Sequence, residues 1–320
     1  MKIPILLYSG EKTNANFSYY SGLGMALYDH SFILIEGKKK ILIVSKMNEK
    51  LAVETFKFGR VFVYLDLKKD LEKLLKKRKI GIDGRNLNVK IYEFLKKISK
   101  PIDISKELSK IRAEKKEIEI EKIRGAVKET KEIIHSIDLK KCKTEKDVEK
   151  ELLKETLERG LEVAFKPIVS TSKNTSFPHY VPSNVKLKDI ILIDYGVKYM
   201  GYCGDISRCF ILGNGPWKKD YELVKQVQLE IIDEIPNCNF GNELAEFTAK
   251  LYKKYGLGEE KHSLGHGIGL EVHEFPSFGI KSRDELKNSV FTVEPGIYRK
   301  NWGVRIEDCI YFDGKKVRVL

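Results

Sequence analysis

The feature that most constrains this chain of 320 residues is a short acidic hairpin near its end. Residues 291–312, FTVEPGIYRKNWGVRIEDCIYF, contain two β-type runs around a polar turn. If the turn is centred on Lys300 and Asn301, Glu294 lies opposite Glu307 on the antiparallel pair. Opposite side chains on such a pair have Cβ atoms about 5 Å apart, and two carboxylates at that distance repel each other by roughly 3 kcal/mol at an effective dielectric constant near 20. The pair therefore predicts a cation between the two carboxylates.

The same arrangement occurs earlier in the chain. Residues 190–212, IILIDYGVKYMGYCGDISRCFIL, also contain two apolar runs, here around a turn near Tyr199 and Met200. This turn places Asp194 opposite Asp205. Because a segment rich in histidine and glycine lies between the two hairpins, we expect the four carboxylates to converge on more than one metal ion.

Length and composition indicate a globular protein of two domains. A chain of 320 residues is longer than a single core usually supports. Its apolar fraction is 42% and its charged fraction 33%, and the latter exceeds the usual value of about 25%. The net charge of +13 raises the question of nucleic acid or an anionic membrane as partner. However, the basic run at 68–79 carries leucines at helical spacing, which predicts an amphipathic helix with a solvated face, and we expect neither a nucleic-acid nor a membrane partner.

Cysteine usage and the first residues point to a compartment. None of the five cysteines has CxxC spacing, and Cys203, Cys209 and Cys309 lie within the hairpin strands. We expect all five to be reduced, small apolar residues of a cytosolic protein. The start, MKIPILLYSG, has only a short apolar run followed by polar residues, so it predicts neither a signal peptide nor a membrane span. The expected location is the cytoplasm.

The hydrophobic pattern divides the chain into a first domain over 1–108 and a second over 109–320. In the first, β-type runs (IPILLY, SFILIE, KILIVS and VFVYL) alternate with helical patterns at 67–79 and 89–100. Such alternation is typical of an α/β domain with a mixed sheet. It contains no glycine-rich loop after a strand and no cluster of acids, so we expect no catalytic residue there.

The second domain repeats one plan. A long charged helix is predicted at 111–137, and a second helix begins after Thr144 as N-cap and ends at Gly160. Strands and the first acidic hairpin follow. Two more helices are predicted at 217–235 and 242–255, followed by the histidine segment and the second hairpin. The order helix, helix, strands, hairpin therefore occurs twice, which predicts two α-α-β halves.

Four of the six histidines lie in motifs near the acidic hairpins: His179, His262, His266 and His273. Glycines on both sides of His266, in HSLGHGIGLEVHE, leave room for a metal ion to approach its ring. We expect His266 to be a ligand and His262 to line the pocket or orient His266. Aspartate, glutamate and one histidine make an oxygen-rich site, which suits Mn²⁺ or a similar ion better than structural zinc.

The stretches LIDYG, GDISRCF, HSLGHGIGLEVHE, TVEPGIY and GVRIED, in this order, resemble the metallopeptidases with the pita-bread fold. This family includes methionine aminopeptidase, aminopeptidase P and proline dipeptidase (prolidase). FSYYSGL and IGIDGRNL also look like the creatinase-type amino-terminal domain of the latter two, so the resemblance covers the whole chain. It implies a creatinase-like α/β domain over 1–108. It also implies an α+β pita-bread catalytic domain over 109–320, with pseudo-twofold α-α-β halves.

The resemblance implies two divalent ions per chain. Asp194 should chelate one ion, Asp205 and Glu307 should bridge both, and His266 and Glu294 should complete the second. Manganese or cobalt is expected, with zinc or iron as alternatives. A hydroxide between the ions would attack the peptide carbonyl, and Glu294 would accept the proton of the attacking water.

The resemblance also implies the residues that meet the substrate. His273 would stabilise the tetrahedral intermediate or shuttle a proton, and His179, in SFPHYVPS, matches a pocket histidine that contacts substrate. Arg305 would orient the bridging carboxylates. The implied activity is hydrolysis of the Xaa-Pro bond in dipeptides or at peptide amino termini, by a homodimer.

One departure from the family pattern concerns substrate length. Many prolidases of this family have, just after the HExP segment, an arginine that grips the terminal carboxylate of the substrate. Here Ser277 follows Pro276, and Lys281 and Arg283 are the nearby cations that would have to substitute. This departure favours aminopeptidase P, which accepts longer chains.

Two alternatives to the peptidase remain. The first is a non-catalytic member of the fold that binds protein or nucleic acid, and the second is a creatinase-like hydrolase. The set of five ligands distinguishes a peptidase from these two alternatives, because both kinds of relative lose some of the ligands. All five are present here.

Overall fold

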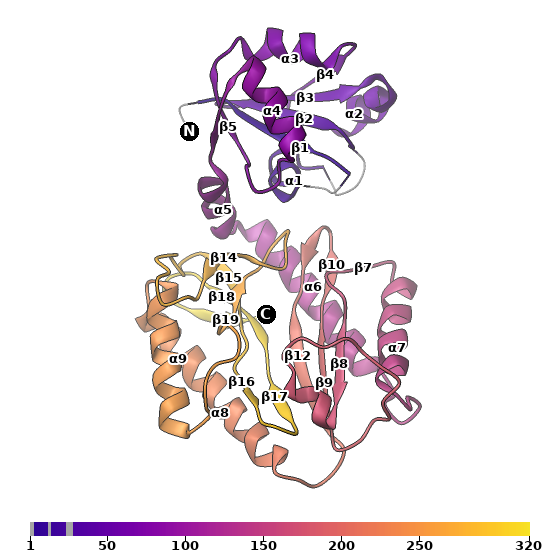
Figure 1. The fold of residues 1–320 in the computed structure, drawn as a ribbon, viewed down its shortest axis with the longest axis vertical. Coiled ribbons are helices and arrows are strands. Elements are labelled where there is room, and N and C mark those ends of the chain that lie inside the picture. Colours follow the sequence, from indigo (N-terminus) through magenta and orange to yellow (C-terminus); the bar gives the residue numbers. More distant parts are fainter. Residues whose placement is uncertain (1–2, 12–13, 24–27) are drawn as a thin grey trace. The chain divides into compact units, whose positions relative to one another are not determined.

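The computed structural model describes residues 3–11, 14–23 and 28–320 (Figure 1). The chain forms two compact units, Met1–Ile111 and Arg112–Leu320. The boundary between these units, after Ile111, falls within the sequence of helix α5 (Ser105–Ala113), which also contains residue 108.

The first unit is built on one mixed sheet of six strands in the order β4-β3-β2-β1-β5-β6. The pairs β1–β2 and β2–β3 are antiparallel, and the others are parallel. Its elements are β1 (Ile5–Ser9), α1 (Ala15–Ser21), β2 (Ser31–Glu36), β3 (Lys39–Ser45), α2 (Glu49–Thr55), β4 (Arg60–Tyr64), α3 (Leu67–Leu75), β5 (Lys79–Ile82), α4 (Val89–Ile98) and β6 (Lys100–Asp103).

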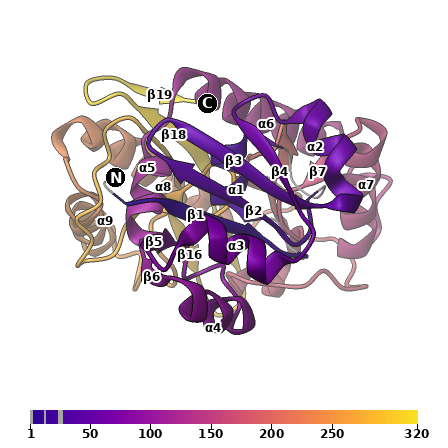
Figure 2. The same cartoon turned by 90° about the horizontal axis from the view of Figure 1, so that it is seen from above.

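Both faces of this sheet are covered by helices, as the view from above shows (Figure 2). Leu71 of α3 and Leu95 of α4 are buried on one face, and Phe17 of α1 and Ala52 of α2 on the other. The four strands expected from the sequence are present. Both expected helices end earlier than predicted. Helix α3 ends at Leu75 because Lys76 takes a left-handed conformation, with φ of 49°, and α4 ends at Ile98 because Ser99 is extended (φ −155°, ψ −177°).

The described residues of the second unit form thirteen strands and four α-helices that lie wholly within it. The helices are α6 (Glu117–Ser136), α7 (Glu145–Glu158), α8 (Trp217–Glu234) and α9 (Gly241–Tyr255). The strands of its first half are β7 (Glu162–Val163), β8 (Ile168–Thr171), β9 (Ile190–Tyr195), β10 (Val197–Tyr199), β11 (Tyr202–Cys203) and β12 (Ile206–Ile211). Those of its second half are β13 (His266–Gly267), β14 (Glu274–Ser277), β15 (Ser289–Val293), β16 (Gly296–Tyr298), β17 (Gly303–Arg305), β18 (Asp308–Phe312) and β19 (Val317–Val319).

Each helix pair packs on the strands of the second unit (Figure 1). Val227 and Ile231 of α8 and Leu244 of α9 are buried in one core with strands β9, β15 and β18. Helix α6 lies against β10 and β11 so closely that a Cβ on Gly204 would be 2.8 Å from the carbonyl group of Ala126. A glycine is therefore required directly before Asp205, where strand and helix approach each other.

The prediction of a single long helix at 111–137 is wrong. The structure has a break between α5 and α6, because Lys116 is extended (φ −81°, ψ 156°) and its N–H donates to the Glu119 carboxylate. The other predicted helices of the second unit are present, and Thr144 caps α7 by accepting a hydrogen bond from the Asp147 N–H.

The register of the second acidic hairpin is as predicted. Tyr298 pairs with Gly303 and Val293 with Asp308, so Glu294 and Glu307 occupy opposite positions between the two paired stretches. The ladder is interrupted there because Pro295 has no N–H to donate.

The register predicted for the first hairpin is wrong by two residues. Asp194 lies opposite Ser207 and not opposite Asp205. The turn is centred on Met200 and Gly201, with φ of 49° and 83°, and positive φ at both central residues is the requirement of the two-residue turn that connects strands most readily. Because side chains alternate with a period of two, a shift of two residues leaves both carboxylates on the same face.

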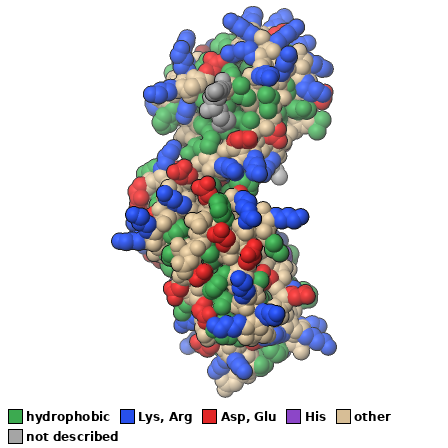
Figure 3. All heavy atoms as spheres, turned by 90° about the vertical axis from the view of Figure 1, so that its left-hand side faces the viewer, with side chains coloured by type: hydrophobic (Ala, Val, Ile, Leu, Met, Phe, Trp, Pro, Cys, Tyr) green, Lys and Arg blue, Asp and Glu red, His purple; other side chains and the backbone are tan. Residues whose placement is uncertain are grey.

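Lysine and arginine side chains cover much of the surface of the first unit on the face in Figure 3, and acidic side chains are mixed with them on the second. Among the described residues, no helix combines the length and apolarity needed to cross a bilayer.

Candidate metal centre

Backbone hydrogen bonds bring three distant segments to one place. The Glu307 N–H donates to the Ser207 carbonyl (3.2 Å), which joins the two hairpins. The Glu294 N–H donates to the Leu264 carbonyl (2.9 Å), which joins the second hairpin to the histidine segment. Glu294 and Glu307 thus use their backbones to link strands, while their side chains remain available to the site.

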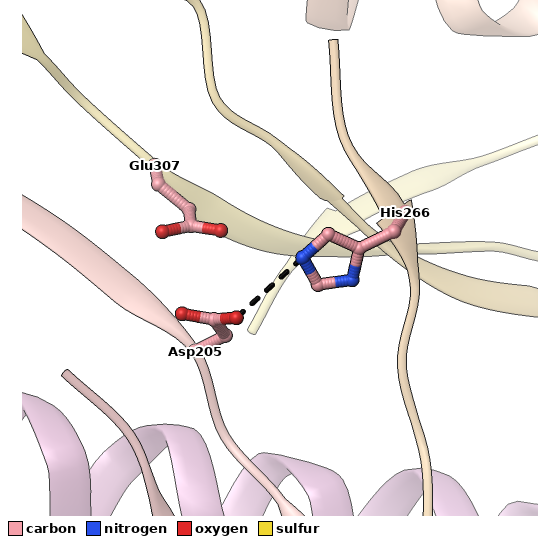
Figure 4. Close-up of side chains that lie close together, drawn as sticks. All are labelled: Asp205, His266 and Glu307. Atoms are coloured by element: carbon pink, nitrogen blue, oxygen red, sulfur yellow. Dashed lines mark ion pairs between the residues drawn. The ribbon is translucent and has the colours of Figure 1, made fainter. Parts of the chain in front are cut away.

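The tightest group of potential ligands is formed by Asp205, His266 and Glu307 (Figure 4). One donor atom from each lies within 4.8 Å of the others. His266 Nε2 is 3.6 Å from an Asp205 carboxylate oxygen and 3.7 Å from Glu294 Oε1. Three of the five predicted ligands therefore form one group, and Glu294 lies beside its histidine.

His266 is presented to this point as a neutral ring. Its Nδ1 lies 3.2 Å from the Gly267 carbonyl, which holds the ring proton there and leaves the Nε2 lone pair facing the carboxylates. Burial, with a smaller effect of His273, lowers the pKa of His266 to about 4. A neutral imidazole is the form that binds metal ions.

The pKa values of the carboxyl groups are shifted in the opposite direction, upward. Burial, followed by the neighbouring Asp194, raises the pKa of Glu307 to about 8. Burial and Glu307 also raise the pKa of Asp205 and of Glu294 well above their usual values. So many buried carboxylates cannot all ionise without a compensating cation.

Arg305 anchors one side of the group. Its Nη2 pairs with the Asp194 carboxylate, and its Nε donates to Ser207 Oγ at 2.9 Å. Ser207 Oγ in turn donates to Glu307 Oε2 at 2.8 Å. Arg305 Nη1 donates to the Tyr298 hydroxyl at 2.8 Å. Arg305 thus touches one predicted ligand directly and a second one through Ser207.

The remaining predicted residues line a cavity of about 550 Å³ together with the ligands. The His273 ring lies edge-on to the His266 ring, with centroids 4.2 Å apart. His262 Nε2 bonds the Tyr298 hydroxyl at 2.7 Å, and burial lowers the pKa of His262 to about 4. His179 is exposed at the cavity wall. All nine predicted site residues therefore line one cavity: His179, Asp194, Asp205, His262, His266, His273, Glu294, Arg305 and Glu307.

Two residues of the site were not predicted, namely Ser207 and Tyr298. Both follow a predicted ligand at even spacing along a strand, Ser207 two residues after Asp205 and Tyr298 four residues after Glu294. The period-two rule would have placed them on the ligand face. Neither Lys281 nor Arg283 lines the cavity, and Ser277 Oγ donates to the Asp284 carboxylate outside it.

The donor set fits divalent cations. Asp194 Oδ1 and Asp205 Oδ1 are buried and have no hydrogen-bond partner within the described part of the chain. Such acceptors are costly to bury unless a cation or donor meets them. Carboxylate oxygens with one imidazole nitrogen are ligands for manganese and similar ions.

Comparison with known proteins gives two family matches. The model of metallopeptidase family M24 matches residues 121–313, and that of the creatinase/prolidase N-terminal domain matches residues 7–113. An uncharacterized peptidase of Methanocaldococcus jannaschii is 36% identical over 311 residues, which cover 92% of this chain and 84% of that protein. The Xaa-Pro dipeptidase of Pyrococcus furiosus is 30% identical over 310 residues, with coverage of 92% and 87%. The crystal structure of an X-Pro aminopeptidase from Thermotoga maritima aligns over 99% of this chain and 94% of that one, with a TM-score of 0.85 and 28% identity.

Proposed function

This chain belongs to metallopeptidase family M24, and from this membership we propose that it is a metal-dependent exopeptidase that hydrolyses Xaa-Pro bonds. The matches confirm the family and the fold class expected from the sequence motifs. The observation that carries the proposal is the convergence of Asp205, His266, Glu294 and Glu307 on one cavity.

We assign the five predicted ligands to two divalent ions, manganese or cobalt. Asp194 would bind one ion, Asp205 and Glu307 both, and His266 and Glu294 the second. When bound, the ions would polarise the scissile carbonyl and lower the pKa of a water held between them. Arg305 and Ser207 hold Asp194 and Glu307 in position for this binding.

The residues around the ligands would handle the proton and the substrate. Glu294, whose pKa is raised by burial and by Glu307, is suited to accept a proton from the attacking water. Burial lowers the pKa of His273. His273 and the exposed His179 would donate hydrogen bonds to the substrate carbonyl as negative charge develops on its oxygen.

The lining of the cavity favours peptides longer than two residues. Among the described residues that line it, Arg305 is the one lysine or arginine, and its contacts with Asp194, Ser207 and Tyr298 occupy it. A dipeptide would place its terminal carboxylate close to the ligand carboxylates without a free cation to receive it. A longer peptide places a neutral amide there.

We also propose that the protein acts as a homodimer in the cytoplasm. The dimer follows from the family resemblance. A reducing compartment agrees with the state of the five cysteines, which are all buried free thiols.

Hydrolysis of two substrates tests the function. Protein stripped with a chelator and reloaded with Mn²⁺ or Co²⁺ would be incubated with a Xaa-Pro dipeptide and a Xaa-Pro-Yaa tripeptide. We expect metal-dependent release of the first residue, faster from the tripeptide. Asp205→Asn should abolish it, and Asp233→Asn, at an exposed position of α8, should not. Metal binding without hydrolysis of either peptide would refute the peptidase and favour a binding protein.

A further inference from the structure

A buried carboxylate follows directly after His273 and meets two buried cations. Glu274 is paired with Lys115 Nζ at 2.8 Å and with Arg112 Nη2 at 3.2 Å. The side chains of all three are at most 4% exposed. Lys115 Nζ also donates to the Arg112 carbonyl at 2.6 Å, and the Lys115 N–H donates to the Asn288 carbonyl at 2.7 Å. Contacts other than those with Glu274 therefore also hold Lys115 in place.

The Glu274 carboxylate organises the loop that ends in His273. The Glu271 N–H donates to Glu274 Oε1 at 3.1 Å, and the Gly269 N–H donates to the Glu271 carbonyl at 3.0 Å. A Cβ on Gly269 would lie 2.6 Å from a Glu274 carboxylate oxygen. The loop backbone thus packs directly on this carboxylate.

The other side of the same loop is tied to the strand that leads to Asp205. The Gly269 carbonyl accepts a hydrogen bond from the Cys203 N–H at 2.7 Å, and Cys203 is two residues before Asp205. The loop is therefore held between the ligand strand and the ion-pair cluster. His273, at its end, is placed 4.2 Å from the His266 ring by these two attachments.

We propose that Arg112 and Lys115 are positioning residues that set the place of His273 through Glu274. Neither cation lines the cavity, so both would act without touching the substrate. Cations are needed there because a buried carboxylate without a partner would take a proton or leave its place. The inference rests on the proposed function, since it takes His273 to be the residue that the loop must place.

Kinetics of folded variants test this role. Glu274→Gln, which keeps the shape of the side chain, and Lys115→Met are expected to lower kcat about 10- to 100-fold, since small misplacements of a reacting group have such effects. KM and bound metal should change less. The matched control is Arg159→Met, which removes a cation that pairs with Glu129 and Glu132 far along α6 and should keep kcat.

A double-mutant comparison separates positioning from general weakening. In a His273→Ala background, Glu274→Gln should cause no further loss of kcat, because the residue that it places is already absent. The proposal would be overturned if the double mutant lost kcat by the product of the two single-mutant factors. It would also be overturned if folded Glu274→Gln kept the full kcat. If Lys115→Met does not fold, Arg112→Met, which removes one of the two cations and leaves Lys115 paired with Glu274, takes its place with the same expectations.

Hydrogen exchange gives a readout that does not depend on catalysis. Amides of residues 269–274 should exchange faster in Glu274→Gln, while peptides from α8 keep their protection. Unchanged exchange in the loop would contradict the positioning role even if the wild-type protein hydrolysed no peptide. Lack of hydrolysis by the wild type, with the exchange result as expected, would instead refute only the proposed function.

Discussion

Removal of bound metal should make the second unit lose stability as the pH rises. In the metal-free chain the pKa values of Asp205, Glu294 and Glu307 are raised, first by burial and then by neighbouring carboxylates. The folded state therefore keeps protons that the unfolded chain releases. A raised pKa in the folded state adds stability below the unfolded pKa, and this stability is lost as the pH rises through the folded pKa.

The size of the loss follows from Glu307. Its pKa rises from 4.5 to about 8, and each pH unit in this window is worth about 1.4 kcal/mol, so the loss is about 5 kcal/mol at most. Between pH 5 and pH 8, which is three pH units, we expect a loss of about 2–4 kcal/mol. Unfolding by urea can be followed in the second unit alone, because both tryptophans, Trp217 and Trp302, belong to it.

Metal binding should reverse the effect and release protons. At pH 7, where a group with a pKa near 8 is mostly protonated, we expect release of about one proton from Glu307 when metal binds. His262 and His266, with pKa values of about 4, are already neutral and release none. Calorimetry in two buffers of different ionisation enthalpy measures this number.

The matched variant is Glu307→Gln, which does not titrate. It should flatten the pH dependence of the metal-free protein and remove about one of the released protons. Metal-free protein that becomes more stable from pH 5 to pH 8, or metal binding at pH 7 without proton release, would refute the reasoning.

Three substitutions test other parts of the site. Ser207→Ala removes a buried hydroxyl that bridges Arg305 and a ligand carboxylate, and we expect a loss of about 1–3 kcal/mol in urea unfolding; no change would show that the bridge is dispensable. Gly204→Ala would place its Cβ 2.8 Å from the backbone of α6 and should cost about 1–3 kcal/mol, whereas Gly279→Ala, with nothing within 4 Å, should be nearly neutral. Equal stabilities of these two variants would contradict the close approach. Tyr298→Phe removes the hydroxyl that accepts from Arg305 and should lower kcat/KM about tenfold, and unchanged kinetics would exclude a role for that hydroxyl.

The hairpins show which parts of the site local sequence could predict. The register around Glu294 and Glu307 was predicted, because the turn is polar and its centre is evident from the flanking apolar runs. The register around Asp194 was wrong, because the turn is centred on Met200 and Gly201, and positive φ at a methionine has no clear signal in sequence. Asp194 and Asp205 were nevertheless placed correctly on the same face, because a shift of two residues keeps a side chain on the same side of the strand.

Contacts between distant segments could not be predicted in the same way. Lys115, in the break before α6, pairs through its side chain with Glu274, which lies 159 residues later in the sequence. A pattern of apolar residues carries no information on such a pair, because lysine and glutamate at these positions look like ordinary surface charges. Arg305 was placed by family resemblance, while its link to Glu307 through Ser207 emerged only from the three-dimensional arrangement.

Two buried glutamates of the second unit show why the site should attract cations from solution. Glu274 meets Lys115 and Arg112, which outweigh burial and lower the pKa of its carboxyl group. Glu307 reaches Arg305 only through Ser207, and its pKa is raised to about 8. The chain has 59 lysine and arginine residues against 46 acidic ones, so cations are not scarce. Within the described part of the chain, the protein supplies two cations to the Glu274 carboxylate and none in direct contact to that of Glu307, so negative charge remains at the site for divalent ions to neutralise. Replacing Glu307 by a neutral residue should therefore weaken metal binding and stabilise the metal-free chain at pH 8.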